Sequence, residues 1–419
     1  MEKIKKEIEN IDIGAIVSDM VKIPSYSFME EQEREISLYI KSFFDKEGIP
    51  CRVVQIEEGR YNVTALLKGE GCGKSLMLSG HTDTVPPYDM EEPFSGRIHQ
   101  GKVFGRGACD MKGPLAAMMV AMAAIKRSGI SLKGDLYFTG VADEEEQGKG
   151  AAYLIKHDLN ADKAVDGVIV GEPTGLHISP GHKGLEWIEV DFSGKKVHGG
   201  RQNEGVNAIE MAARFINRIY ETYMPLLKSR DYPVLGSPTI NIGTIQGGDQ
   251  PSTVPDRCIL TLDRRMVPSE TIQQVYDELG EIADKLHQED PRFECEIRDM
   301  FEDNKTLPHI PFVTEEQDPL MMSIKKACAE TGVETVIEPF PAWTDAGFIS
   351  SCTQSTCVVI GPGQLAKAHS PEECVEIAEV SRAAEIYALC ALDYCGFRDC
   401  DDYDVNNCCV GERNEKKDR

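Results

Sequence analysis

Residues 76–86 read LMLSGHTDTVP, an apolar run that is closed by a glycine and followed at once by His81 and Asp83. A short apolar run that ends in Gly and polar residues predicts a buried β-strand. Similar runs predict strands at Tyr61–Leu67, Ser75–Ser79, Asp135–Val141, Gly167–Val170 and Thr356–Ile360. Between two of them, Pro114–Ser128 is rich in Ala and Met and begins with Pro, which predicts a buried helix. Strands that alternate with helices predict an α/β domain whose sheet is covered on both faces.

From about Gly184 the pattern changes to a strand, a helix, two strands, a helix and a strand. The expected segments are Leu185–Phe192, Val206–Tyr223, Thr239–Ile245, Ile259–Arg265, Ser269–His287 and Phe293–Arg298. This order is that of a ferredoxin-like α+β domain. We therefore expect residues 184–301 to form a domain inserted into a discontinuous α/β domain of residues 1–183 and 302–419. In that larger domain, Ser370 and Glu373 have the spacing of a capping box, which predicts that the final helix begins there.

The chain of 419 residues carries 70 Asp and Glu against 45 Lys and Arg, a formal net charge of −25. This excess argues against broad electrostatic binding of nucleic acid or of anionic membranes, because both need basic surfaces. No apolar run approaches the ~20 residues that span a bilayer, and the N-terminus lacks the apolar segment of a signal peptide. We expect a cytoplasmic enzyme whose 14 cysteines are reduced thiols. We assign no function to the acidic, Cys-bearing tail.

Polar groups follow several of the predicted strands at the point where each strand ends. His81 follows LMLSG, the run DEEE at 143–146 follows FTGVA, Glu172 follows VIVG, and His369 comes shortly after CVVIGPG. A further carboxylate, Asp110, lies in the Gly-rich turn GRGACDMKGP just before the Ala/Met helix. In open α/β sheets ligands bind beyond the carboxyl ends of strands, so we expect these groups to converge in one crevice. Two histidines and several carboxylates without a thiolate motif are typical ligands of zinc or a similar divalent metal.

Single residues within these motifs have separate predicted roles. His81 and Asp83 are two apart in an extended segment and point the same way, so Asp83 is expected to orient the ring of a metal-bound His81. Of adjacent carboxylates at a metal, one can bind the ion while another stays off it and moves protons as general base and then acid. We assign Glu145 as the ligand and Glu144 as the base. Glu146, one step along the chain, is the alternative in this register.

The motifs SGHTDTVP, GRGACDMKGP, ADEEEQG, VGEPT and GPGQLAKAHSPEE occur in this order along nearly the whole chain. In this combination the chain resembles the co-catalytic di-zinc amidohydrolases that include acetylornithine deacetylase, succinyl-diaminopimelate desuccinylase, aminoacylase and glutamate carboxypeptidases. The resemblance implies that His81, Asp110 and Glu172 hold one zinc ion, and that Asp110, Glu145 and His369 hold the other.

The resemblance also implies a reaction, which is amide hydrolysis. Two metal ions can share one water, lower its pKa from 15.7 towards about 7, and stabilise the charge that develops on the attacked carbonyl. Glu144 would take the remaining proton and deliver it to the leaving amine. The bridging Asp110 is commonly followed by a cis peptide bond in this family, here Asp110–Met111. We expect two divalent ions, most simply Zn²⁺, although Co²⁺ and Mn²⁺ suit the same carboxylate and imidazole ligands.

The inserted domain resembles the lid of the same family, through which its members form dimers. In GKKVHGG, His198 matches a histidine that stabilises the tetrahedral intermediate, often across a dimer, although glycines follow it where the family usually has Ser or Ala. Asn241 in TINIGTIQGG and Arg264 in LDRRMVP resemble groups that bind the carboxylate end of the substrate. An Arg suits that role because its planar fork binds a carboxylate bidentately, and Arg265 would point to the other face of the strand. The resemblance thus implies a homodimer and a small substrate that bears a carboxylate.

We therefore expect a deacylase that acts on an N-acyl amino acid or a short peptide with a free carboxylate. A dipeptidase or carboxypeptidase of the same family is the first alternative. A non-catalytic metal-binding interaction protein is the second alternative, and Glu144 argues against it, because a scaffold has no need of an unliganded carboxylate beside its ligands. No motif in the sequence names the acyl group or the amine.

Overall fold

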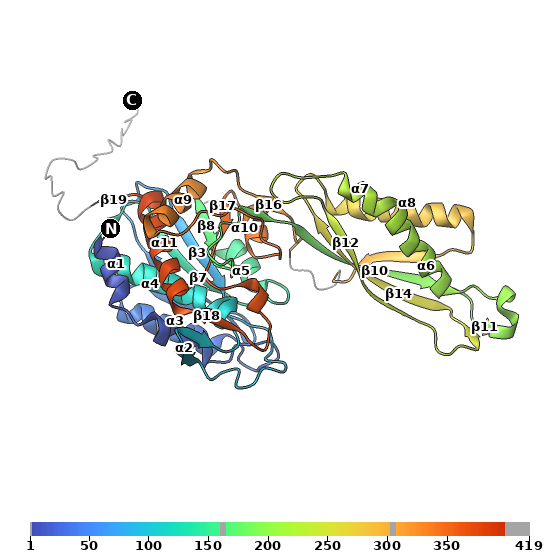
Figure 1. The fold of residues 1–419 in the computed structure, drawn as a ribbon, viewed down its shortest axis with the longest axis horizontal. Helices are drawn as coiled ribbons and strands as arrows, with labels where there is room; N and C mark the ends of the chain where they lie inside the picture. Colours follow the sequence, from blue (N-terminus) through green and yellow to red (C-terminus); the bar gives the residue numbers. More distant parts are fainter. Residues whose placement is uncertain (1, 160–164, 302–306, 399–419) are drawn as a thin grey trace, which may run out of the picture.

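The computed structural model describes residues 2–159, 165–301 and 307–398. Two lobes lie side by side along its longest axis (Figure 1). The first and last parts of the chain, coloured blue to green and orange to red, make the larger lobe, and the yellow-green middle part makes the smaller one. This arrangement agrees with an inserted domain. Residues 302–306, where we expected the chain to return to the larger lobe, lie outside the described residues, so the bounds 184–301 stay a prediction.

The larger lobe is built on a mixed sheet in which, within the described residues, six strands run in the order β1-β2-β7-β3-β8-β17. In that order they are Cys51–Glu57, Arg60–Leu67, Leu136–Val141, Leu76–His81, Gly167–Val170 and Thr356–Val359. β7, β3, β8 and β17 run parallel to one another, while β1 and β2 pair antiparallel. The prediction of an α/β domain is confirmed. The sequence pattern does not single out β1, because this edge strand buries none of its residues fully.

Successive residues of the central strands point to opposite faces of the sheet, and each face has its own apolar core. Leu76 and Leu78 of β3 pack into one core, whereas Met77 packs into the other. The first face is covered by α1 (Glu2–Glu9), α2 (Ile13–Val21), α3 (Arg34–Lys46), α4 (Gly113–Ser128), α9 (Pro319–Thr331) and α11 (Ile377–Cys395), and the second by α5 (Lys149–His157) and α10 (Ala346–Cys352). As predicted, helices cover both faces of the sheet, and the ends of its strands stay uncovered by them.

The helix α4 is apolar on all sides. Together with the turn before it, Ala108–Ser128 is long and apolar enough to cross a membrane, so our expectation that no run approaches this length was wrong. The whole apolar window is buried inside the protein, where α4 packs against α11, α1 and β3. A helix that is apolar all round needs cover on every side, and here the larger lobe supplies it. Ala108–Ser128 is therefore the central core helix of this lobe.

The predicted helix start at Ser370 is wrong. Residues 374–376 form a short strand, β18 (Cys374–Glu376), that pairs with β5 (Lys102–Phe104), and α11 begins only at Ile377. The reason is that Glu373 does not turn back to cap a helix. Its buried carboxylate instead accepts the backbone N–H groups of Cys109 and Asp110.

The smaller lobe has a sheet of its own, in which the described strands run in the order β12-β14-β10-β15, each antiparallel to its neighbours. Along the chain its elements are β10 (Gly184–Ser193), α6 (Ala208–Arg218), β12 (Thr239–Gly247), β14 (Arg257–Met266), α8 (Ile272–Glu289) and β15 (Cys295–Asp299). This is the predicted order of elements. The predicted helix over 206–223 is shorter than expected, because a wider turn at Ile219–Tyr223 separates α6 from α7 (Met224–Lys228). α6 and α8 cover one face of the sheet, and the lobe has a separate apolar core.

Candidate metal centre

The predicted ligands meet at the carboxyl ends of the parallel strands of the main sheet. His81 is the last residue of β3, and Glu172 follows β8 by two residues. Glu145 lies in the turn after β7, and His369 lies in the connection from β17 to α11. Parallel neighbours end on the same side of a sheet, so their side chains reach one place from segments far apart in the chain.

Asp110 reaches the same place from the irregular helical turn Ala108–Lys112, which precedes α4. Gly107 enters this turn with a φ of 81°, and both Asp110 and Met111 depart from helical dihedral angles. The peptide bond between Asp110 and Met111 is cis, as the family resemblance implies. The turn directs the Asp110 carboxylate towards two histidines.

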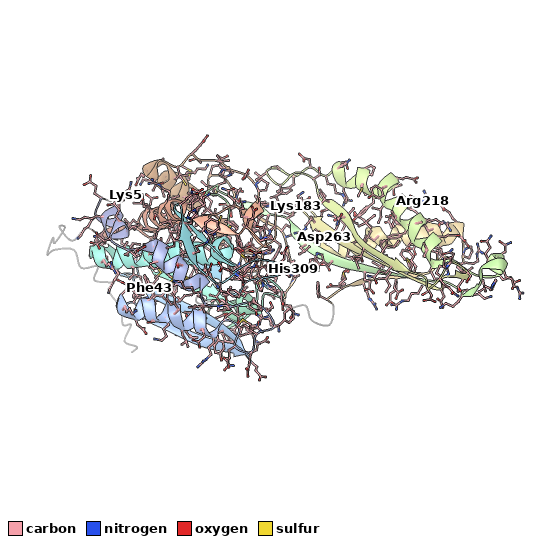
Figure 2. The ribbon with its side chains drawn as sticks, turned by 60° about the horizontal axis from the view of Figure 1, so that its bottom comes forward. Lys5, Phe43, Lys183, Arg218, Asp263 and His309 are labelled. Atoms are coloured by element: carbon pink, nitrogen blue, oxygen red, sulfur yellow. The ribbon has the colours of Figure 1, made fainter. Side chains whose placement is uncertain are left out.

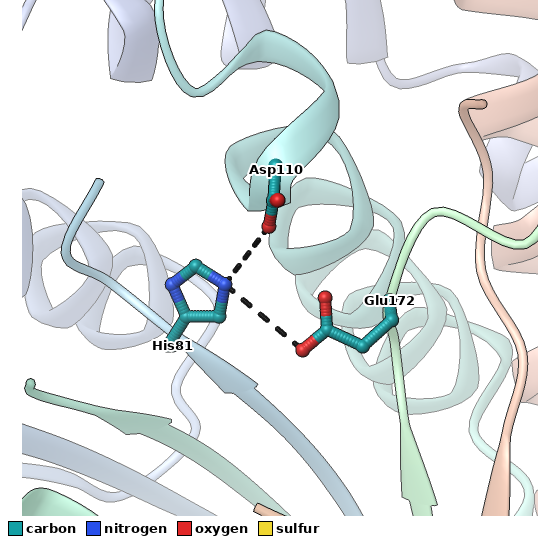
Figure 3. A group of neighbouring side chains, drawn as sticks. All are labelled: His81, Asp110 and Glu172. Carbon is teal, nitrogen blue, oxygen red and sulfur yellow. Dashed lines mark hydrogen bonds and ion pairs between the residues drawn. The ribbon is translucent and has the colours of Figure 1, made fainter. Parts of the chain in front are cut away.

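The first group of candidate ligands is buried (Figure 3). Nε2 of His81 lies 3.0 Å from Oδ1 of Asp110 and 4.0 Å from Oε1 of Glu172. All three side chains are almost fully shielded from solvent. One candidate ligand atom of each residue lies within 4.8 Å of the others, which is a spacing that one cation can bridge.

The second group shares Asp110 with the first and is open to solvent on one side. Nε2 of His369 lies 3.3 Å from Oδ2 of Asp110 and 3.1 Å from Oε1 of Glu145. The side chain of His369 is 48% exposed. Because Asp110 offers a different oxygen to each histidine, the two groups together fit a pair of divalent cations with one bridging carboxylate. The structure thus brings together all five residues that the resemblance implies as ligands.

The protons of the histidines offset part of the negative charge at this edge. Hydrogen bonds to Asp110 and Glu145 raise the pKa of His369 to about 10. Burial raises the pKa of Glu172 to about 8, with a further contribution from Asp110 and against the effect of His81. Burial also opposes ionisation of Asp110, but hydrogen bonds from His369 and His81 outweigh it and hold the pKa of Asp110 below its usual value. Ligands must lose their protons to bind a cation, so cation binding and proton release are coupled here.

Glu144 belongs to neither ligand group, although Glu145 beside it belongs to the second. Burial raises the pKa of Glu144 well above its usual value, and the charges of Glu172 and Asp345 raise it further, against the effect of His81. A carboxyl group that belongs to neither ligand group, yet lies beside Glu145 and within reach of the charges of His81 and Glu172, has the position that a general base needs.

Asp83 stabilises this arrangement through hydrogen bonds. The predicted contact between its carboxylate and the His81 ring is long, with Nδ1 3.6 Å from Oδ1 of Asp83. Nδ1 of His81 instead donates to the backbone carbonyl oxygen of Asp83, at 2.9 Å, which leaves Nε2 free to face the ligand group. The carboxylate of Asp83 accepts the backbone N–H groups of Glu144 at 3.2 Å and Glu145 at 3.1 Å. Asp83 therefore positions the candidate base and its neighbour as well as the histidine.

Glu146, the alternative in this register, points away from the ligands. It is exposed, and its Oε2 lies 3.5 Å from Nη2 of Arg60. The same guanidinium forms buried ion pairs with Glu33 and with Asp143, at 2.5 Å and 2.6 Å. Sequence reasoning missed this network, because Arg60 stands in β2 and carries no motif that links it to the DEEE run.

The three residues predicted in the smaller lobe do not reach the ligands. His198 lies in β11 (Val197–His198), at the end of the smaller lobe that is farthest from the larger one (Figure 1). It is exposed, and its Nδ1 accepts the backbone N–H of Gly200 at 3.1 Å. Asn241 is exposed on β12, an edge strand of its sheet. These two positions are open to a partner, but not to the ligands of the same chain.

Arg264 is buried inside the smaller lobe. Its Nη2 lies 2.5 Å from Oε1 of Glu270, and its Nε donates to the hydroxyl of Tyr223 at 3.2 Å. Residues of β14 alternate between the two faces of the sheet, and Arg264 shares the buried face with Leu262, whereas Arg265 is on the other face. Arg265 pairs with Asp263, which lies at the junction of the two lobes (Figure 2).

A further carboxyl group near the ligands was not predicted as a site residue. Asp345 is buried, and its Oδ1 has no hydrogen-bond partner among the described residues. Burial raises the pKa of Asp345 to about 8, and the charges of Asp83 and Asp143 raise it further, against the effect of His81. The preceding residue, Thr344, contacts Nε2 of His182, a histidine beside the junction of the lobes. The only clue in the sequence is the short string TDAGF.

The sequence of this chain matches a known family over most of its length. Residues 77–393 match the family described as Peptidase family M20/M25/M40. An acetylornithine deacetylase of Proteus mirabilis is 31% identical over 368 residues, which cover 83% of this chain and 86% of that protein. An N-formyl-4-amino-5-aminomethyl-2-methylpyrimidine deformylase of Halalkalibacterium halodurans is 28% identical, covering 92% of this chain and 95% of that protein.

The fold is shared with solved structures at lower sequence identity. Aminopeptidase PepT from Bacillus cereus has a TM-score of 0.75 at 20% identity and covers 93% of this chain and 98% of its own. The M20 family metallo-carboxypeptidase Sso-CP2 from Sulfolobus solfataricus also has a TM-score of 0.75 at 20% identity, covering 92% and 99%. These similarities extend over both lobes.

Divalent cations are expected to stabilise the folded protein, because they bind ligands that converge only in the native state. At free Zn²⁺ 100 times above its dissociation constant, one bound ion contributes about 2.7 kcal/mol. The melting temperature of chelator-treated protein should therefore rise on addition of Zn²⁺, as measured by calorimetry.

The His369→Ala variant should lose part of this rise, because it removes a ligand of the second group only. The matched control is His177→Ala, because His177 is also about half-exposed and also bonds a glutamate, Glu338, at 2.6 Å, outside both ligand groups. Equal rises in the wild type and His369→Ala would contradict the assignment of the second group.

Proposed function

We propose that this chain, which belongs to the peptidase family M20/M25/M40, removes the acyl group from an N-acylated amino acid or short peptide with a free carboxylate. The chain is a metal-dependent enzyme that hydrolyses amide bonds, as its family and its relatives indicate. The family and the relatives therefore argue against the alternative of a non-catalytic scaffold.

The observation that carries the proposal is the position of Glu144. It lies next to a member of the second ligand group and belongs to neither group, and Asp83 binds its backbone N–H. We assign His81, Asp110 and Glu172 to one ion, and Asp110, Glu145 and His369 to the other. The ions are proposed to be Zn²⁺, with Co²⁺ and Mn²⁺ as functional substitutes.

The proposed chemistry divides between the ions and the protein. When bound, two such ions would lower the pKa of a coordinated water and polarise the carbonyl of the substrate. Glu144 accepts a proton from the attacking water and delivers it to the nitrogen of the leaving amine. Asp83 keeps the Nδ1 proton of His81 in place and holds Glu144 at a fixed distance from it.

The charge of the centre suits a substrate with a carboxylate. Asp110, Glu145 and Glu172 bring three negative charges against the four positive charges of two divalent ions, so one positive charge is left over for the substrate. We propose Arg265 in place of the buried Arg264 as a group for the substrate carboxylate, with Asn241 from a second copy. Support for Arg265 comes from its partly exposed side chain and from Asp263 at the junction of the lobes.

A small acyl group is favoured by the relatives. Acetylornithine deacetylase and the pyrimidine deformylase are both named for the removal of a short acyl group from nitrogen, and they match over most of this chain. A dipeptidase or carboxypeptidase of the same family is the second candidate, because the family as a whole is described as one of peptidases.

We propose a homodimer through the smaller lobe as the active form, with no nucleic-acid or membrane partner and with a cytoplasmic location. His198 supports the dimer, because it is exposed at the far end of the smaller lobe, where it can enter the site of a second copy but not its own (Figure 1). There its imidazole would stabilise the charge on the attacked carbonyl oxygen.

The Glu144→Ala variant should lose at least about 10²- to 10⁴-fold in kcat, because it removes the proton carrier. Its metal content, measured by elemental analysis, should equal that of the wild type. Glu146→Ala is the matched control, since it removes the neighbouring carboxylate that points to Arg60, and its kcat should stay within a few-fold of wild type. Full activity of Glu144→Ala would show that Glu144 is not the general base.

Mixing two inactive variants tests the dimer. His198→Ala and Glu144→Ala each leave one intact half of the machinery, so a mixed dimer restores one complete site. Equal mixing with random exchange of subunits should restore about a quarter of the wild-type activity. If the mixture stays as inactive as its components while subunit exchange is verified by mass spectrometry, His198 does not act across the dimer.

A substrate panel decides between the two candidates. N-acetylornithine, N-succinyl-diaminopimelate, other N-acyl amino acids and dipeptides should each be assayed with Zn²⁺, Co²⁺ and Mn²⁺. We expect the highest kcat/KM with an N-acyl amino acid, and the corresponding amide without a free carboxylate should react more slowly. A higher kcat/KM with dipeptides would favour the peptidase.

A further inference from the structure

A buried ion pair between Arg106 and Glu373 lies directly behind the proposed metal centre. Their side chains are 1% and 0% exposed, and Nη1 of Arg106 contacts Oε2 of Glu373. Arg106 comes four residues before Asp110, and Glu373 comes four residues after His369. The pair therefore joins two of the three segments that carry candidate ligands of the second ion, those of Asp110 and His369.

Glu373 binds the backbone of the bridging ligand. Its Oε1 accepts the N–H of Cys109 at 3.0 Å and the N–H of Asp110 at 3.1 Å. Asp110 lies in a turn that departs from helical dihedral angles, so the usual helical hydrogen bonds do not fix its orientation. Two consecutive N–H groups held by one carboxylate fix the peptide plane from which the Asp110 side chain projects.

Arg106 binds the backbone of two other segments that carry ligands. Its Nη2 donates to the carbonyl oxygen of His369 at 3.4 Å, and its Nε donates to the carbonyl oxygen of Pro86 at 3.2 Å. Pro86 lies in the segment that follows His81 and Asp83. One planar guanidinium thus connects the segments of His81 and His369 to the carboxylate that holds Asp110.

His369 has particular need of such a contact. Its φ is 61°, a left-handed conformation that is unfavourable for a residue other than glycine, and its side chain is about half-exposed. A strained backbone conformation at a functional site persists only where its surroundings enforce it. The hydrogen bond from Arg106 to the carbonyl of His369 acts on that residue itself.

Stability alone is a weak reason for this ion pair. A buried ion pair pays a large desolvation cost, and apolar residues of similar volume often serve stability as well or better. Here the atoms of both side chains that the ion pair does not use form hydrogen bonds to the backbone of ligands or of segments next to ligands. Groups in such positions typically change metal affinity 10- to 100-fold when they are replaced.

We infer that Arg106 and Glu373 form a clamp that positions the bridging Asp110 and His369, and thereby sets the affinity of the second metal ion. The inference rests on the proposed two-ion centre and adds residues that touch neither the ions nor the substrate. The second ion depends on the clamp more than the first, since two of its three ligands, Asp110 and His369, are held by it. The first ion keeps the buried His81 and Glu172.

The test is a titration of chelator-treated protein with Zn²⁺ by calorimetry, repeated with Co²⁺ and followed by visible absorption. Glu373→Gln keeps an oxygen for the two N–H groups and loses the charge, while Glu373→Ala loses both. We expect the dissociation constant of the weaker ion to rise about 10-fold or more in Glu373→Gln and towards 100-fold in Glu373→Ala. The tighter ion should change less in each variant. Arg106→Lys, which keeps the charge without the fork, should resemble Glu373→Gln.

The matched control is Glu270→Gln in the smaller lobe. Glu270 also forms a buried ion pair with an arginine, Arg264, and its other oxygen accepts the backbone N–H of Val267 at 3.1 Å. It differs from Glu373 in its distance from any ligand. Glu270→Gln should lower the melting temperature without changing either dissociation constant.

The outcomes separate the clamp from the centre that it serves. Fewer than two ions bound to the wild type would overturn both the two-ion centre and the clamp. Two ions in the wild type, with unchanged affinities in a folded Glu373→Gln or Arg106→Lys, would overturn the clamp alone. A loss of affinity in Glu270→Gln as large as that in Glu373→Gln would reduce the clamp to a general contribution to stability.

Discussion

Both proposed metal positions share the carboxylate of Asp110, whose Oδ1 faces His81 and whose Oδ2 faces His369. The backbone at Asp110 departs from the path of the helix that follows it, within the turn at Ala108–Lys112. The helix that follows this turn is buried on every side, and its packing holds the turn in place. An apolar helix in the core is therefore what gives the bridging group a fixed place.

The remaining groups reach Asp110 because parallel strands end together. That geometry also crowds like charges at the same ends of the strands, and the protons of the two histidines offset part of this crowding. The formal charge of −25 describes the whole chain and says little about this edge. With divalent ions in place the local field would reverse, which would let a strongly acidic protein accept the carboxylate-bearing substrate proposed above.

Local patterns predicted most of the larger lobe and pointed to the candidate ligands, because His81, Glu145 and Glu172 follow closely after apolar strands and Asp110 lies in a Gly-rich turn before an apolar helix. They failed where distant contacts decide. Ser370 and Glu373 have the spacing of a capping box, but the Glu373 carboxylate pairs with Arg106, which is 267 residues away. Which of Arg264 and Arg265 faces the core depends on how β14 packs against α6 and α8, and the sequence gives only their alternation. The catalytic role of His198 depends on a partner chain and stays a prediction.

The order of segments along the chain has a consequence for synthesis on the ribosome. The smaller lobe stands between Glu172 and His369, which are separated by about 200 residues. At ribosomal rates of about 5–20 residues per second, roughly 10–40 seconds pass between the two ligands. During that interval β17 has not yet been synthesised, and β8 is the exposed margin of the nascent sheet. All residues of β8 are buried in the folded protein. The nascent enzyme must keep this margin from pairing with other chains until its last quarter emerges.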